Sequence, residues 1–110
     1  MLTYKRNQGD SLWMTGTCQQ VDGIDPLWNN WSGAWNVTAV DGGPVLVSGN
    51  LLKHATEKIF YVRSGPVTTP GWAALPVGTY LLTMQIDNSV VDYRHEEQVK
   101  LVIRAQGLTP

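Results

Sequence analysis

The sequence is short of the residue types on which most metal proteins and many enzymes depend. Among its 110 residues there is one cysteine, Cys18, and there are two histidines, His54 and His95. A single thiol cannot form an internal disulfide, and a structural zinc site needs further thiols or a histidine cluster. We therefore expect no metal ion and no cofactor, and we interpret Cys18 as a buried core thiol.

Charge is scarce as well. Charged residues make up 15% of the chain, the formal net charge is −1, and the eight basic residues are scattered along the sequence. No basic stripe is present that would neutralise phosphates, so we do not expect nucleic-acid binding. A hydrophobic content of 43% excludes a disordered polyelectrolyte. The surface must then be covered by neutral polar and aromatic groups, which favours a protein that works against a partner.

Long hydrophobic runs are also absent. No segment approaches the roughly 18 to 20 apolar residues that span a bilayer, so no membrane partner is expected. Residues 1–6 lack the basic-then-apolar order of a signal peptide, which predicts a chain made and kept in a cytoplasm. The length suits one domain. We expect that domain at residues 9–110, preceded by residues 1–8 as a flexible arm or an edge strand.

Strand-like alternation is the main pattern present. Apolar and polar side chains alternate with a period of two in residues 79–86 and again in residues 98–104. These two runs predict an antiparallel pair, with residues 90–97 as their polar connection. Residues 35–39 and 45–49 flank the turn cluster at 41–44 and predict a hairpin. Two more strands are expected, at residues 12–17, as the first strand of the domain, and at residues 59–63.

Helical spacing is confined to residues 51–58, which allow two turns at most. About six or seven short strands separated by Gly and Pro turns, without a helix long enough for a crossover, predict an all-β protein. The fold class expected is an immunoglobulin-like antiparallel β-sandwich. Two loops, at residues 21–32 and 64–74, are long for such a fold, and long ordered loops often carry function.

Candidates for catalysis or metal binding are weak. His54 has no evident catalytic partner, and we interpret it as a surface or hinge residue. Residues 95–97, His-Glu-Glu, contain cation ligands, but neighbouring strand residues point to opposite faces, which favours a solvated polar turn. Asp22 and Asp25 fit a turn better than a calcium loop, which supplies more carboxylates. Phosphate-binding and hydrolase motifs are missing. We expect that the chain is not an enzyme.

Tryptophan is the outstanding feature, with five residues in the chain. Trp28, Trp31 and Trp35 lie close together, next to Asn30. Trp35 opens a predicted strand and is expected in the core. The other two allow three interpretations: a cap on the sandwich, an anchor at a protein interface, or a sugar-binding platform. Trp72 lies in a loop stiffened by prolines, and either anchors a neighbouring subunit or packs on its own domain.

Three short motifs occur in an order that resembles a phage group. They are Gly9-Asp10 before a strand, Trp31-Ser32-Gly33-Ala34 at the start of a middle strand, and Leu75-Pro76-x-Gly78-x-Tyr80 before the strongest alternation. Together they resemble the small Ig-like domains of tailed-bacteriophage structural proteins, such as the N-terminal domain of baseplate upper proteins. The resemblance covers residues 9–103 and departs from the group at residues 28–35.

The resemblance implies a structural protein of a tailed-phage virion without enzymatic activity, either a capsid decoration or cement subunit or a tail or baseplate component. Such a protein is made in the host cytoplasm, resides in the virion, and binds capsid or tail proteins as a homo-oligomer or multicopy array. We expect its partner-binding residues to be Trp28, Asn30, Trp31 and Trp72. The alternative is a carbohydrate-binding β-sandwich module that uses residues 28–35 to bind a glycan.

Overall fold

A computed structural model describes residues 3–8, 10, 12–17, 27–53, 59–64, 71–72 and 74–105. Its regular elements are one 3₁₀ turn and eight strands: β1 (Thr3–Asn7), β2 (Leu12–Thr17), η1 (Trp28–Asn30), β3 (Trp31–Ala39), β4 (Val47–Asn50), β5 (Leu52–Lys53), β6 (Ile59–Ser64), β7 (Gly78–Asn88) and β8 (Tyr93–Arg104). Within this part of the chain no helix is long and apolar enough to cross a membrane.

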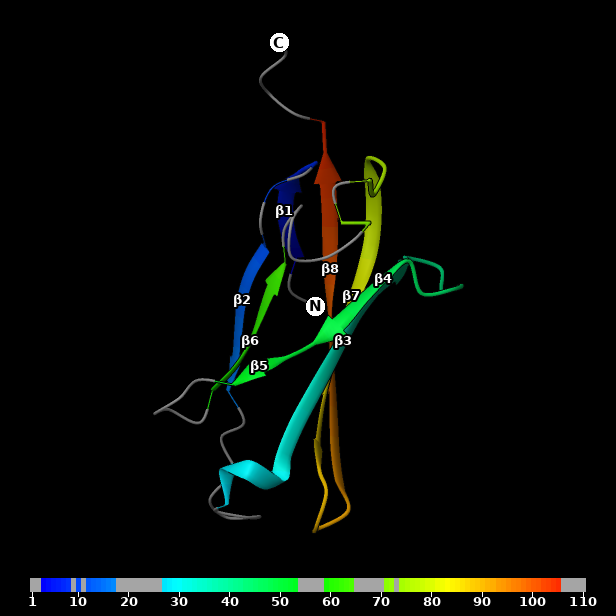
Figure 1. Cartoon of the computed structure of the whole chain (residues 1–110). Helices are drawn as coiled ribbons and strands as arrows, with labels where there is room; N and C mark the ends of the chain where they lie inside the picture. The colour runs from blue at the N-terminus through cyan, green and yellow to red at the C-terminus, as the bar shows by residue number, and fades with distance from the viewer. Residues whose placement is uncertain are drawn as a thin grey trace.

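The strands form two sheets that pack as a sandwich (Figure 1). The larger sheet has the order β1-β8-β7-β3-β4, and the smaller has the order β2-β6-β5. Every pairing is antiparallel except the parallel pairing of β1 with β8. The predicted all-β sandwich is confirmed, and the described residues form eight strands where six or seven were expected.

Alternating side chains of the large sheet build the core. On β7 and β8 the cross-strand pairs Tyr80–Leu101 and Leu82–Val99 place four buried side chains on the inner face. Phe60 of β6 belongs to the same buried cluster, so this face packs against the small sheet. Full burial of each such side chain contributes about 1.5–3 kcal/mol. The apolar half of each alternating run therefore holds the two sheets together, and the other half faces solvent.

The β7–β8 connection is shorter than expected. Residues 90–97 were predicted to be a polar connection, but β8 begins at Tyr93, and only residues 89–92 turn the chain. The turn is closed by the buried Asn88, whose Oδ1 accepts hydrogen bonds of 2.8 Å from the N–H groups of Val90 and Val91. Residues 94–98 are exposed on both faces of the strand. That is why they lack the apolar alternation by which strands are recognised.

The N-terminal strand, the short strand β5 and the β3–β4 hairpin can each be compared with what the sequence predicted. The first strand is β1 and not residues 12–17. Of the two alternatives for the N-terminal segment, an arm or an edge strand, β1 is the edge strand. The sequence allowed a helix of at most two turns at residues 51–58, but Leu52 and Lys53 pair with β6 as strand β5. Residues 54–58 lie outside the described part of the chain. The predicted hairpin at residues 35–49 is confirmed as β3 and β4, with β3 starting earlier, at Trp31.

Candidate functional site

Two of the four expected partner-binding residues are core residues. Trp31 and Trp72 are only 1% and 2% exposed. The Trp72 indole Nε1 donates a hydrogen bond of 2.7 Å to the main-chain oxygen of Asp10, and the Trp31 ring packs edge-on against Tyr93. Because their rings are covered by this chain itself, the expectation that Trp31 and Trp72 anchor a neighbour is wrong. Trp35 is buried, as predicted.

The other two expected residues, Trp28 and Asn30, belong to η1 and are half-buried. The centroid of the Trp28 ring lies 4.8 Å from the centroid of the Phe60 ring. The Lys53 ammonium lies 5.1 Å from the same Trp28 centroid. Lys53 Nζ also donates hydrogen bonds to the main-chain oxygens of Trp28 and Trp31. The main-chain oxygen of Asn30 accepts from Ser89. Trp28 thus caps the sandwich, which was one of the interpretations left open.

A sugar-binding platform made from residues 28–35 is not available in this arrangement. Stacking on a sugar ring needs an accessible aromatic face. Trp31 and Trp35 are buried, and Trp28 is covered on one side by Phe60. The interpretation of this segment as a sugar-binding platform of neighbouring tryptophans is therefore wrong.

The weak candidates for chemistry do not converge. His95 Nε2 lies 3.2 Å from Glu97 Oε1, and both side chains are exposed. Glu96 belongs to the opposite face of β8, so the three side chains cannot share one ion. Within the described residues no group of three or more His, Cys, Asp or Glu side chains is placed to hold a metal ion. Cys18, Asp22, Asp25 and His54 lie outside those residues.

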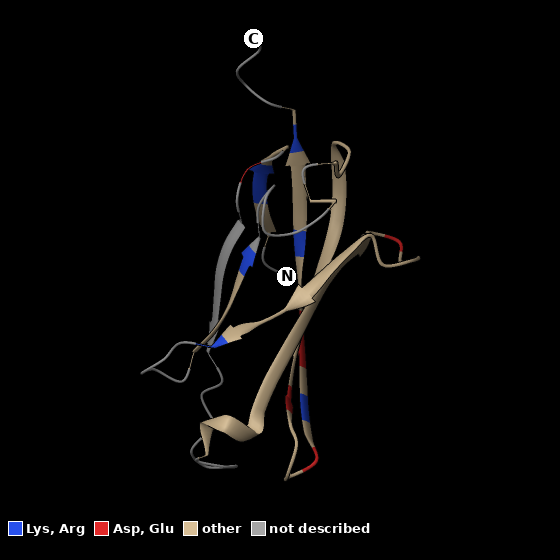
Figure 2. Ribbon diagram, viewed as in Figure 1, with Lys and Arg blue, Asp and Glu red and all other residues tan. Residues whose placement is uncertain are grey.

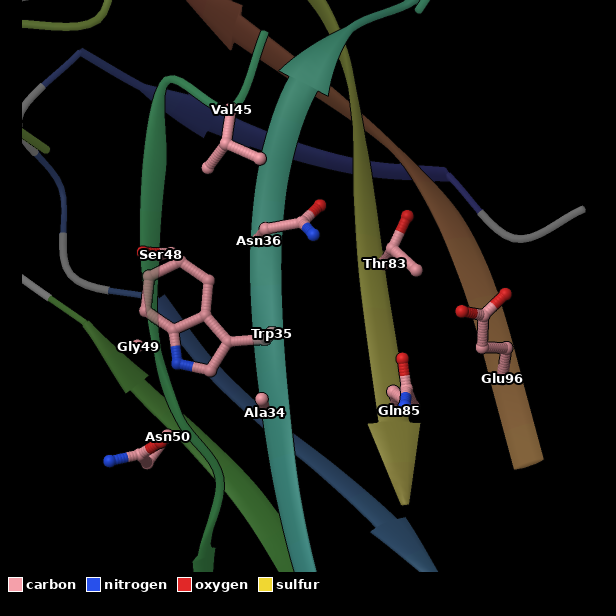
Figure 3. A pocket seen from close by; sticks show the side chains of 10 residues that line it. All are labelled: Ala34, Trp35, Asn36, Val45, Ser48, Gly49, Asn50, Thr83, Gln85 and Glu96. Carbon is pink, nitrogen blue, oxygen red and sulfur yellow. The ribbon is translucent and has the colours of Figure 1, made fainter. Parts of the chain in front are cut away.

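A groove of about 500 Å³ lies on the outer face of the large sheet (Figure 3). Most of its side chains come from the outward positions of β3, β4, β7 and β8, which the strand register brings together. Its lining residues are Ala34, Trp35, Asn36, Val45, Ser48, Gly49, Asn50, Thr83, Gln85 and Glu96. The large sheet thus has a hollowed outer surface opposite the face that carries the core.

Two small residues, on opposite faces of the sheet, make room for larger neighbours: Ala34 at the groove and Gly49 at the core. Ala34 leaves space between Asn50 and Gln85, its cross-strand neighbours. Gly49 allows the Trp35 indole to lie against the β4 backbone, since a Cβ at this position would come within 2.9 Å of three ring atoms. A strand interior is an unfavourable place for glycine, and the close approach of a ring explains its presence.

The groove offers neutral hydrogen-bonding groups. Hydroxyl and carboxamide side chains line it, and Glu96 is its one charged residue. Gln98 Nε2, next to the groove, donates to Thr83 Oγ1 over 3.2 Å, and Gln85 Nε2 donates to both carboxylate oxygens of Asp87. Such groups bind the polar atoms of a partner and supply neither a strong base nor an activated nucleophile.

One ion pair stands on this face, at the end near the β7–β8 turn. Arg94 Nε donates to Asp87 Oδ1 over 2.8 Å. The hydrogen bond to Asp87 is the main reason why the pKa of Arg94 is raised above its ordinary value. Both groups are solvated, so the pair contributes little to stability.

The sequence contained a signal for this surface that was not used. The polar half of the alternation in β3 and β7, including Asn36, Thr38, Thr83 and Gln85, is almost free of charge. What could not be foreseen was that these strands are neighbours.

Comparison of the chain with protein-family models, with curated proteins and with solved structures finds no match.

Proposed function

We propose that this chain is a structural subunit of immunoglobulin-like type, without enzymatic activity, that attaches to neighbouring proteins in a tailed-phage virion. The outer face of the large sheet is its attachment surface. The observation that carries the proposal is the composition of that face, which is exposed, grooved and neutral at its centre. Interface centres are similarly depleted of charged residues.

The strand arrangement supports the immunoglobulin-like part of the proposal. With β2, β6 and β5 taken as strands B, E and D, and β3, β4, β7 and β8 as C, C′, F and G, the two sheets have the membership of such sandwiches. The exception is β1, which pairs with β8. Tyr80, near the start of β7, donates a 2.6 Å hydrogen bond to the main-chain oxygen of Pro76, which corresponds to the tyrosine corner. Trp35 supplies the buried tryptophan of strand C.

The size of the face also suits a protein partner. Five strands about 4.8 Å apart, with a mean length of about 27 Å, present a surface on the order of 650 Å². A stable interface buries about 800 Å² on each partner. Uncharged side chains of small or medium size occupy the centre, at Ala34, Asn36, Ser48 and Thr83, so a partner surface can approach closely.

The virion setting rests on the phage-like motif order. One of its three motifs, residues 75–80, forms the turn into β7 and contains both atoms of the tyrosine-corner hydrogen bond. A capsid decoration, a tail part or a baseplate part each repeats by symmetry, and repetition turns a modest single contact into firm attachment. The partners are then capsid or tail proteins of the same virion, including further copies of this chain.

Mass spectrometry of density-gradient-purified particles from a lysed culture that makes this chain tests the proposal. We expect the chain in intact particles at many copies, and the copy number separates a capsid decoration from a tail or baseplate part. Absence of the chain from intact particles contradicts the virion setting.

A glycan is the second candidate ligand, because the groove presents amide and hydroxyl groups that suit sugar hydroxyls. Trp35 lines the groove, so its fluorescence serves as a reporter. Saturable quenching by an oligosaccharide in the wild-type chain, lost in Asn36→Ala, would support glycan binding over protein attachment.

A further inference from the structure

We infer that the outer face of the large sheet binds a second copy of this chain, packed face to face with its strands antiparallel. In that arrangement Glu96 of each copy lies opposite Lys100 of the other. The inference rests on the proposed function and names the partner of the attachment surface. Three features carry it: charge distribution, register and shape.

Charge is segregated along the long β7–β8 hairpin (Figure 2). Near the turn the outer face holds Asp87, which is paired with Arg94, and the exposed Glu96, whereas His95 and Glu97 belong to the other face of β8. At the other end of β8 the outer face carries three exposed cations, Lys5, Lys100 and Arg104. Among the described residues Glu96, Lys5, Lys100 and Arg104 form no salt bridge. One end of the face therefore complements the other end of an identical face.

The strand register makes the face self-complementary about Gln98. Glu96 and Lys100 lie on the same face of β8, each two residues, or about 7 Å, from Gln98. A twofold axis that lies in the interface and crosses β8 at Gln98 places Glu96 of one copy opposite Lys100 of the other, twice over. Packing with strands parallel would place Glu96 opposite Glu96. The charges therefore favour the antiparallel dimer.

The shape of the outer face also fits the antiparallel dimer. The same axis crosses β7 at Thr83, which is paired with Gln98, and it brings Leu81 of one copy opposite Gln85 of the other. Leu81 is the half-buried apolar side chain on the outward positions of β7. Gln85 and its neighbour Ala34 line the groove. Each copy thus inserts one apolar side chain into the hollow of its partner, and the flat neutral centre closes around it.

Glu96 and Lys100 do not pair within one chain. They are four residues apart on one strand, which separates their Cα atoms by about 13 Å. An effect of exchanging both charges therefore reports a contact between copies.

The test is sedimentation velocity of the full chain, in low salt, over a range of concentrations. We expect a closed dimer for the wild type. Glu96→Lys or Lys100→Glu alone places like charges together twice, so each should raise the dimer dissociation constant roughly tenfold or more. The double variant exchanges the charges and should restore the dimer. Asp41→Lys, in the exposed β3–β4 connection, is the matched control and should leave the dimer unchanged. Circular dichroism of each variant verifies the fold.

Three results would overturn the inference: a monomer at every concentration, single variants that dimerise like the wild type, or growth beyond the dimer into chains. The test is independent of the particle experiment. A monomeric chain that is abundant in particles keeps the proposed function and assigns the face to another virion protein. A dimer with the expected charge dependence that is absent from particles contradicts the virion setting and keeps the dimer.

Discussion

The aromatic residues of this protein are fixed by their polar atoms as well as by their rings. Tyr80 and Trp72 are buried, and each donates one hydrogen bond to a main-chain oxygen, at Pro76 and Asp10 respectively. A buried donor without a partner costs about 1–3 kcal/mol. These two bonds join segments that carry no regular structure to the core, and their removal is measurable.

Tyr80→Phe removes the hydroxyl that bonds to Pro76 and keeps the ring. We expect the free energy of unfolding to fall by about 0.5–1.5 kcal/mol, because Pro76 is exposed and water can take over its carbonyl. Urea denaturation measures this as a lower midpoint with an unchanged slope. An unchanged midpoint would show that the Tyr80–Pro76 hydrogen bond contributes nothing to stability.

The same residue makes stability depend on pH in alkali. Burial raises the pKa of the Tyr80 phenol above its ordinary value of 10.0. The folded chain then keeps a proton that the unfolded chain loses, so this contribution is complete below about pH 10 and is lost as pH rises through the folded pKa. Denaturation midpoints of wild type and Tyr80→Phe, compared from about pH 8 to pH 11, should converge at the alkaline end. A constant difference would contradict the burial of the phenol.

Trp72→Ala should destabilise the fold, and it should not act selectively on attachment. Removing a buried tryptophan costs about 3–5 kcal/mol, a large part of the stability of a small domain. The loss is measured by thermal or urea unfolding. Leu52→Ala, at an exposed position of β5, is the control and should change the unfolding free energy little. A fully stable Trp72→Ala protein would mean that the ring is not in the core.

At the scale of elements, the turn between β7 and β8 depends on one side chain. Asn88→Ala deletes the acceptor of the Val90 and Val91 N–H groups. We expect faster hydrogen exchange at these two amides, with exchange unchanged at Leu82 and Leu101 in the middle of the hairpin. Mass spectrometry with local fragmentation resolves the sites. Unchanged exchange at Val90 and Val91 would show that the backbone holds the turn unaided.

The elements predicted from sequence are those with one buried face. Residues 79–86 and 98–104 alternate because β7 and β8 lie across the core, and their antiparallel pairing was foreseen. The first half of β8 was missed because both of its faces are exposed. For β1 the sequence left an arm and an edge strand open, because a single apolar residue, Tyr4, packs against the core. Alternation reports burial, so strands that bury little leave no pattern.

The candidate site was misplaced for a related reason. A segment without periodicity does not indicate which way its tryptophans face. Trp31 and Trp72 are in fact buried in the core. The groove, by contrast, is made of ordinary polar residues that become neighbours only through the order β4-β3-β7-β8. Hydrophobic alternation fixes the face of each strand and leaves its neighbours open. Sequence thus indicated the polar face of each strand, and the assembled surface required the fold.

On the scale of the whole molecule, the two faces of the large sheet differ in exposure and charge. One face of the large sheet carries the core, and the opposite face is exposed, grooved and charged in opposite senses at its two ends. A surface of this kind is suited to repeated contact between identical or neighbouring subunits.

The central claim, attachment through the outer face of the large sheet, is tested most directly by a competition for incorporation into particles. Thr83→Arg places a long charged side chain at the centre of that face, and Leu52→Arg places the same side chain on the exposed surface of β5 in the other sheet. Each variant is co-expressed with the wild type, and isotope-coded peptides give the ratio of variant to wild type in purified particles. Thr83→Arg should be depleted at least tenfold and Leu52→Arg should enter in proportion to its expression. Equal incorporation of both variants would contradict attachment through this face.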